Sequence, residues 1–260
     1  MRPQQRLGAL IRETGSLFTV DKAADALGVS NIEAAKICAR WAKQGWLSRV
    51  KRGLYAVVPL EAAPGESMLE DAWILIPNLY APCYVGGWSA AEYWDLTEQI
   101  FYSTCVLTSR PQAHKQQKYQ SLTFFVKKVQ SNMLFGTEIV WINETKVQIS
   151  DPHKTIIDML YDPQLGGGIQ HTIDCIKEYF KSDRCDFEKL VQYAKRMNKG
   201  AVLKRLGFIA EMQLGEDHLV TSLCRRNLSK GYIYIDPKLK IGSLITRWNL
   251  FVPDSIRRIT

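Results

Sequence analysis

The sequence predicts an α+β protein in which an N-terminal winged helix-turn-helix is followed by a mixed α/β domain. Three observations indicate this fold. Three short helix signatures run into a hairpin pattern before residue 58, a stretch with two prolines and a glycine follows, and strand patterns then precede a helical run. We therefore expect a winged-helix module at residues 1–58, a linker at 59–65 and a second domain at 66–260.

The three N-terminal helices have recognisable start and stop signals. The first has apolar residues at helical spacing and stops at Gly15, and the second lies between a Thr19 N-cap and Gly28. The third begins with a capping box made of Ser30 and Glu33. Two short helices joined by a tight glycine-containing turn are typical of a helix-turn-helix.

The third helix is amphipathic and carries cations on its polar face. Small residues, Ala35 and Ala39, lie between the two faces and would allow a close approach to a major groove. The apolar face comprises Ala34, Ile37, Cys38 and Trp41, and the polar face comprises Glu33, Lys36, Arg40 and Lys43.

The stretch GWLSRVKRGLYAVV, residues 45–58, predicts a strand–turn–strand hairpin directly after this helix. Its tip holds Gly53, and Arg49, Lys51 and Arg52 make that end strongly cationic. We interpret the hairpin as the wing of the module, which would reach the DNA backbone or minor groove beside the third helix.

Charge is unevenly distributed along the chain. Residues 1–58 contain ten Lys and Arg against four Asp and Glu, residues 59–199 fourteen against seventeen, and residues 200–260 ten against five. A cationic module favours a polyanionic partner, because neutralised phosphates release counterions; the alternatives are a protein-interaction module or a solvated face. The predicted partner is double-stranded DNA, contacted by Ser30, Asn31, Lys36, Arg40, Lys43, Arg49, Lys51 and Arg52.

The second domain reads as strands followed by helices. SMLEDAWILIPNLY is expected to be helical, and PCYVGGWSAAEYWDL to be an extended piece leading into a helix capped by Ser89, with Glu92 three residues on. Strands are predicted in TCVLTSR, LTFFVKKV, TEIVWIN and TKVQISD. Four helices then run from Asp151 to the QL of residues 213–214, and a strand pair near YIYIDP and SLITRWNLFV ends the chain.

Several functional classes lack their sequence signatures. The longest apolar runs, such as AWILI, are far too short to span a bilayer, and MRPQQRLGAL has no signal-peptide core, so we expect a cytoplasmic protein without a membrane partner. The six cysteines include no Cys-x-x-Cys pair and are expected to be buried free thiols. We predict no metal site and no cofactor.

Four carboxylates raise the alternative of a metal-dependent nuclease: Glu138, Asp151, Asp158 and Asp162. Lys154 is available beside them, but it lies four residues before Asp158 on a predicted helix, which we interpret as pairing on the helix surface. The glycine run at residues 166–168 lacks the Lys-Ser/Thr of a phosphate-binding loop. We predict that the protein is not an enzyme.

Four segments, in order along nearly the whole chain, resemble the AbiEi family of antitoxins from bacterial type IV toxin–antitoxin systems. They are RVKRGLYAV, YVGGWSAAEYWDLTEQ, VQISDPHKTIIDMLYDPQLGGG and YIYIDPKLKIGSLITRWNLFV. Trp41 and Trp88 depart from the family pattern, in which smaller aliphatic or polar residues are expected. Their departure concerns the details of helix packing.

The resemblance implies an antitoxin that also represses its own operon by binding inverted repeats in its promoter. It further implies a second domain that counteracts a nucleotidyltransferase-like toxin in phage defence. The basic C-terminal end predicts a partner surface formed by Lys204, Arg205, Arg225, Arg226 and Arg247. Two alternatives stay open: a winged-helix regulator whose second domain senses a ligand, and a defence-associated nuclease.

Overall fold

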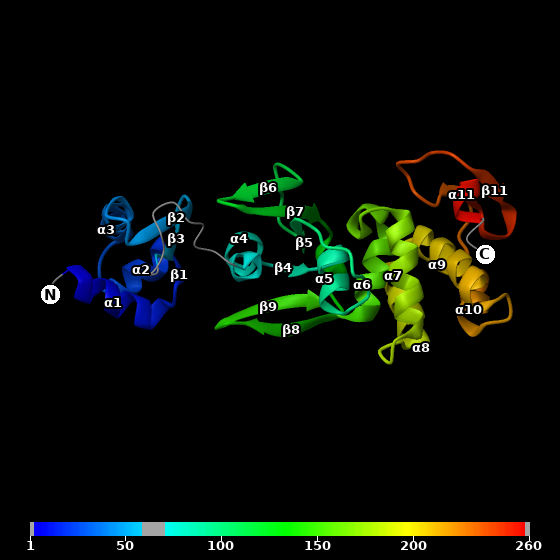
Figure 1. Cartoon of the computed structure of the whole chain (residues 1–260), viewed down its shortest axis with the longest axis horizontal. Helices are drawn as coiled ribbons and strands as arrows, with labels where there is room; N and C mark the ends of the chain where they lie inside the picture. The colour runs from blue at the N-terminus through cyan, green and yellow to red at the C-terminus, as the bar shows by residue number, and fades with distance from the viewer. Residues whose placement is uncertain (1–2, 59–70, 258–260) are drawn as a thin grey trace.

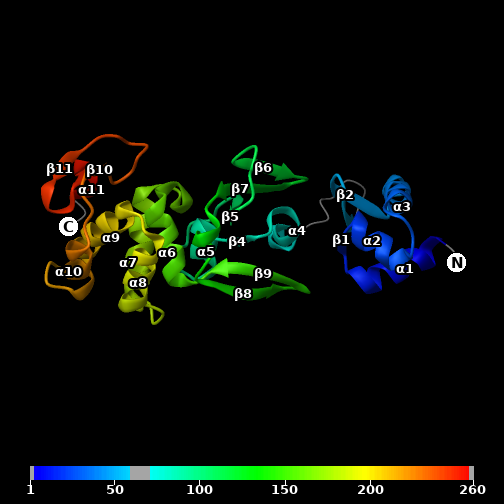
Figure 2. The ribbon, with the colours of Figure 1, turned by 180° about the vertical axis from the view of Figure 1, so that it is seen from behind.

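The computed structural model describes residues 3–58 and 71–257, so the predicted linker at 59–65 and the first residues of the second domain lie outside the described residues. The molecule is elongated (Figures 1 and 2). The N-terminal module lies at one end, a six-stranded sheet in the middle, and helices with a small sheet at the other end. The predicted fold class, a winged helix followed by a mixed α/β domain, is confirmed.

The N-terminal module consists of three helices and a three-stranded sheet in the order β1-β3-β2. Its elements are α1 (Pro3–Thr14), β1 (Leu17–Thr19), α2 (Val20–Leu27), α3 (Asn31–Lys43), β2 (Leu47–Lys51) and β3 (Leu54–Val57). The expected signals hold: Thr19 caps α2, left-handed Gly28 ends it, and Ser30 caps α3. β1, which was not predicted from the sequence, pairs antiparallel with β3.

The sheet of this module has a different apolar cluster on each face. Phe18, Leu47 and Tyr55 belong to the module's own core, together with Ala34, Cys38 and Trp41 of the helices. The other face contributes Leu17, Val50, Leu54 and Ala56 to a cluster that continues into the second domain. That cluster includes residues of a short 3-10 helix, η1 (Ala72–Leu75), and of α4 (Ile76–Tyr80).

The central sheet is mixed and has the strand order β6-β7-β5-β4-β9-β8. β5 pairs parallel with β7 and antiparallel with β4, while β8 and β9 form an antiparallel hairpin. The strands are β4 (Cys83–Val85), β5 (Ser103–Thr108), β6 (Gln116–Tyr119), β7 (Leu122–Lys128), β8 (Thr137–Ile142) and β9 (Thr145–Ser150). The four strands predicted from sequence are present, and the polar β6 was missed.

Both faces of the central sheet are covered. Successive strand residues point to opposite sides, so each strand contributes to both covered faces. Val106 and Val126 face the cluster shared with the N-terminal module, whereas Tyr84, Cys105 and Leu107 belong to the core under the helices. The central strands therefore carry nearly continuous apolar runs.

Helices from the middle and the C-terminal part of the chain pack on that second face, and a small sheet follows. The helices are α5 (Gly87–Tyr93), α6 (Pro152–Tyr161), α7 (Ile169–Lys181), α8 (Phe187–Met197), α9 (Gly200–Leu214), α10 (Leu219–Arg226) and α11 (Asp254–Arg257). The sheet has the order β10-β12-β11, from β10 (Ile233–Tyr234), β11 (Ser243–Ile245) and β12 (Leu250–Val252). Among the helices described here, none is long and apolar enough to cross a membrane.

The predicted cap of α5 is wrong, because that helix begins earlier than Ser89. Its N-cap is Gly86, and Ser89 lies inside the helix, where its hydroxyl accepts the backbone N–H of Cys105 at 2.9 Å. Gly87 has a φ of +54°, and a Cβ there would lie 2.2 Å from the carbonyl oxygen of Leu165. A glycine is needed here for both reasons.

Candidate nucleic-acid interface and second-domain sites

Local capping determines where α3 begins, and packing of one face holds the helix in place. The Ser30 hydroxyl accepts the backbone N–H of Glu33 at 3.3 Å, which satisfies one donor of the first turn. Ala34, Cys38 and Trp41 are buried in the module core, so the helix is held by one face only. The opposite face is therefore free to meet a partner.

The free face of α3 presents three cations. Lys36, Arg40 and Lys43 are exposed, and the exposed Ala39 beside Arg40 leaves room for close approach. In Figure 1, α3 lies on the side of the module away from the second domain. Because the buried residues of α3 face the module core and the second domain covers the other face of the module's sheet, the cationic face of α3 is turned away from the second domain. Lys36, Arg40 and Lys43 are called the α3 cations below.

Two predicted DNA contacts at the start of α3 are already engaged within the module. The amide of Asn31 donates to the carboxylate of Asp21 at 2.9 Å, and Ser30 is the helix cap. Both side chains are exposed, and the Asn31–Asp21 bond ties α3 to α2. Base reading by Asn31 would require this bond to open.

The predicted cations of the wing differ in their exposure to solvent. Arg49 and Arg52 are exposed, whereas Lys51 is half-buried on the side of the second domain. Burial, and then the nearby charge of Arg110, lower the pKa of Lys51. Ser48 on the same strand accepts a hydrogen bond from Gln120 of the second domain at 2.7 Å. Part of the wing therefore contacts the protein itself.

The predicted partner surface is wrong for Lys204 and Arg205, which are buried in α9. The ammonium of Lys204 donates to the carbonyl oxygen of Gly231 at 2.5 Å. The Arg205 guanidinium donates to backbone carbonyls of Leu160 and Ile235, both at 2.7 Å. Burial lowers the pKa of Arg205 to about 10. These two cations join α9 to α6 and to the segment at β10.

The other three residues of that predicted surface are exposed, and two of them are paired. Arg247 contacts the buried carboxylate of Glu211 at 2.7 Å and the exposed one of Glu216 at 3.1 Å. Arg225 lies 3.8 Å from Glu211. Arg226 is exposed at the end of α10. A partner surface on these three arginines stays a prediction.

The predicted surface pairing of Lys154 and Asp158 is wrong, because both side chains are fully buried. The Lys154 ammonium contacts Asp158 and donates to the Tyr84 hydroxyl at 2.8 Å, and that hydroxyl donates to Asp158 at 2.8 Å. Burial lowers the pKa of Lys154 and raises that of Asp158, and their mutual attraction opposes both shifts. The surrounding apolar residues of TIIDMLY were the sequence signal for this burial.

Asp151 begins α6 and gathers several donors. Its carboxylate accepts the backbone N–H of Lys154 at 2.7 Å and the Tyr193 hydroxyl at 2.9 Å, and lies 3.2 Å from the Lys189 ammonium. Burial alone would raise the Asp151 pKa. The His153 imidazole 3.6 Å away, the hydrogen bonds from the Lys154 N–H and the Tyr193 hydroxyl, and the Lys189 charge outweigh burial and hold the pKa below its ordinary value.

The four carboxylates considered for a nuclease occupy separate settings. Glu138 is exposed on β8, Asp158 is bonded to Lys154, and Asp162 pairs with Lys127 at 2.7 Å. Within residues 3–58 and 71–257, no three His, Cys, Asp or Glu side chains are grouped as metal ligands. The six cysteines are free thiols, four of them buried and two, Cys83 and Cys185, half-buried.

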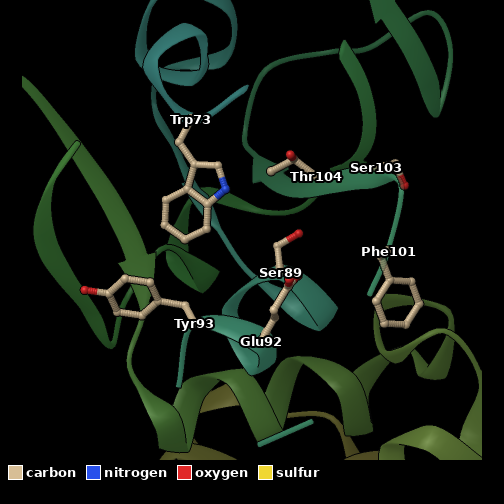
Figure 3. Close-up of a pocket in the computed structure, with 7 residues that line it drawn as sticks. All are labelled: Trp73, Ser89, Glu92, Tyr93, Phe101, Ser103 and Thr104. Atoms are coloured by element: carbon tan, nitrogen blue, oxygen red, sulfur yellow. The ribbon is translucent and has the colours of Figure 1, made fainter. Parts of the chain in front are cut away.

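A cavity of about 290 Å³ opens between α5, η1 and the start of β5 (Figure 3). Its residues are Trp73, Ser89, Glu92, Tyr93, Phe101, Ser103 and Thr104. In Figure 3 the Glu92 side chain extends from α5 towards Ser89, and the Trp73 indole lies across from Thr104. The cavity could not be predicted from the sequence, because its residues come from three separate segments.

Two comparisons relate the chain to known proteins. Residues 5–58 match a family model described as a transcriptional regulator, AbiEi antitoxin, which confirms the resemblance over the N-terminal module. The crystal structure of the RV2827C protein from Mycobacterium tuberculosis has a similar fold, with a TM-score of 0.62 and 12% identity, covering 96% of this chain and 91% of that chain. This likeness shows the fold alone. No curated protein matches the sequence significantly.

Proposed function

We propose that this protein is the antitoxin of a type IV toxin–antitoxin system and represses its own operon by binding inverted repeats in its promoter. The family match over the N-terminal module supports a role as antitoxin and transcriptional regulator. The resemblance of the later segments favours a second domain that counteracts a nucleotidyltransferase-like toxin in phage defence. We further propose that the protein is cytoplasmic and has no catalytic role of its own.

One observation carries the DNA-binding part of the proposal: the exposed row of α3 cations on a helix buried by its opposite face. A recognition helix must present its outer face to the major groove while its inner face is held by the module. Arg49 and Arg52 extend the positive surface onto the wing. Lys51 contributes less in this arrangement, because it is half-buried near Arg110.

The test is the salt dependence of binding to the duplex upstream of the operon, measured for the full chain. Lys36→Ala, Arg40→Ala and Arg49→Ala should each reduce the slope of log K against log salt by about 1, because each removes one phosphate contact. A side chain that reads a base edge should also relax specificity at one position, by about 1–3 kcal/mol.

Arg12→Ala is the matched control, since Arg12 is an exposed cation of the same module that borders the second domain. It should leave the slope unchanged. Unchanged slopes for the three test variants, with a reduced slope for Arg12→Ala, would place the DNA on the other side of the module and overturn the proposal.

The antitoxin part is tested separately by co-expression with the neighbouring nucleotidyltransferase-like gene. Arg40→Ala should lose repression of the operon and still protect cells, because the substitution lies in the N-terminal module only. Loss of protection, with the toxin level held constant from an independent promoter, would mean that DNA binding is itself required for antitoxicity.

A cavity at the border of module and second domain favours one alternative, a ligand-sensing regulator. It measures about 620 Å³ and is bordered by the end of α1, by Asn78 and by the β8–β9 turn. Binding sites for small molecules are often found at such borders and have volumes in this range. The alternative predicts that a small-molecule fraction of cell extract changes the affinity of the purified chain for its promoter.

A further inference from the structure

The cavity of Figure 3 has electron-rich walls. Trp73, Tyr93 and Phe101 supply three aromatic rings to its lining, and the rings of Trp73 and Tyr93 lie 5.6 Å apart. Phe101 is fixed by stacking on Trp88 at 5.1 Å. The faces of aromatic rings attract cations, especially where water is partly excluded.

A carboxylate without a partner lies in the same cavity. Within the described parts of the chain, the Glu92 carboxylate makes no hydrogen bond or ion pair, and the side chain is directed towards Ser89 (Figure 3). The hydroxyls of Ser89 and Thr104 add further acceptor oxygens. No Lys or Arg is among the residues that line the cavity in the described structure.

The surrounding sequence is also free of positive charge. Residues 71–109 contain Asp71, Glu92, Asp95 and Glu98 but no Lys or Arg. The chain as a whole carries a net charge of +8, so an acidic stretch of this length is unusual within it. The stretch that lines the cavity therefore contributes only negative charge, which favours a cationic ligand.

Exposed apolar side chains lie next to the cavity. Ile100 is 76% exposed and Tyr102 is fully exposed, while Phe101 between them lines the cavity. Exposed aromatic and aliphatic groups beside a pocket are typical of protein interfaces. A partner polypeptide would cover them, whereas a free small cation would leave them in water.

We propose that this cavity binds a lysine or arginine side chain of a partner protein, with Ile100 and Tyr102 packing against apolar residues that flank that side chain. The cation is held by Glu92 and by the faces of Trp73 and Tyr93, and the Ser89 and Thr104 oxygens accept its N–H groups. The proposal goes beyond the proposed function and does not depend on the α3 cations.

The first test uses N-acetyl-arginine amide, with N-acetyl-citrulline amide as its uncharged counterpart. Each is titrated into the full chain while the indole N–H signals are followed by nuclear magnetic resonance, with the Trp73 signal assigned from Trp73→Phe. We expect the arginine compound to shift that signal and to bind at least tenfold more tightly than citrulline. Equal affinities, or an unmoved Trp73 signal, would overturn the proposal.

Glu92→Gln should weaken the binding of N-acetyl-arginine amide by about fivefold or more. Glu98→Gln is the matched control, because Glu98 is exposed six residues further on and does not line the cavity. Both residues are exposed, so neither variant should alter the circular dichroism of the chain. A Glu92→Gln variant that binds as tightly as the parent would show that the carboxylate has no role.

The partner-protein part is tested with the short peptide N-acetyl-Leu-Arg-Leu amide. Its affinity should exceed that of N-acetyl-arginine amide by about fivefold, and Tyr102→Ala should remove that gain without changing the affinity for the single amino acid. A peptide that binds no better than N-acetyl-arginine amide would limit the site to free cations and overturn the assignment to a partner protein. Failure of operon repression would leave all of these binding results unchanged.

Discussion

At the scale of single residues, the Lys154–Asp158 pair shows how one spacing can have two opposite meanings. An i,i+4 Lys and Asp on a helix usually pair in water and contribute little. Here both side chains are fully buried and share the Tyr84 hydroxyl. The spacing predicted that the two would pair, but only the packing of α5, α7 and α9 around α6 determined that the pair is inside.

Lys154→Met should destabilise the chain by about 3–5 kcal/mol, because it leaves the buried Asp158 without its counter-ion. The double variant Lys154→Met with Asp158→Leu should recover much of that loss, since neither charge then remains buried. Chemical denaturation, followed by circular dichroism, measures both free energies of unfolding. A double variant less stable than Lys154→Met would show that the pair adds net stability in this core.

Asp151 predicts a specific dependence of stability on pH. Its native pKa lies below 3.8, so the folded chain binds fewer protons here than the unfolded chain, and the contribution of Asp151 is lost as pH falls through that lowered pKa. Asp151→Asn keeps an oxygen to cap α6 but loses the charge.

We expect Asp151→Asn to cost about 1.5–3 kcal/mol at pH 7, the usual range for hydrogen bonds to a charged group. The difference from the parent should shrink below pH 3.8. Denaturation curves at a series of pH values measure it, and Asp174→Asn, at an exposed position, is the control. A difference independent of pH would assign the effect to packing alone.

At the scale of elements, local signals were sufficient where an element is determined by its own ends. Thr19, Gly28 and Ser30 predicted the boundaries of α2 and α3, because caps act within a few residues. β1 was missed because it is short and pairs with β3, which is distant in sequence. β6 was missed because it is short, polar and at the edge of the central sheet. The start of α5 depends on the contact of Gly87 with Leu165, which no local pattern contains.

Ser30→Ala should separate a structural role from a DNA contact. Loss of the cap of α3 should cost about 1 kcal/mol of stability. Because the hydroxyl is engaged at the helix end, we expect the salt slope of DNA binding to change by less than that of Arg40→Ala. Thermal unfolding and salt titrations of the two variants give both quantities. A slope that falls as far as it does in Arg40→Ala would make Ser30 a phosphate contact.

At the scale of the whole molecule, the wing sheet is shared between two cores. Trp46, Leu47 and the other alternating apolar residues predicted a hairpin, but could not show that Val50, Leu54 and Ala56 meet the second domain. The exposed α3 cations could be predicted from helical periodicity, whereas the burial of Lys204 and Arg205 could not, because α9 is covered on all sides. The expected division at residues 59–65 stays a prediction. If the chain is divided there, the apolar residues that the module contributes to the shared cluster lose their cover.

The isolated module of residues 1–58 tests this consequence of the shared cluster. Removing the second domain exposes Leu17, Val50, Leu54 and Ala56, all buried in the full chain. Re-exposing even one large apolar side chain costs roughly 1.5–3 kcal/mol. Hydrogen exchange of β2 and β3 amides should therefore be at least about tenfold faster in the isolated module than in the full chain.

The α3 cations should be unaffected by this truncation, because they lie on the other side of the module's sheet from the shared cluster. At low temperature, where the isolated module is still folded, its salt slope on promoter DNA should equal that of the full chain. Equal exchange rates in β2 and β3 would show that the module folds independently of the cluster it shares. A reduced salt slope with the module folded would instead mean that the second domain supplies phosphate contacts of its own.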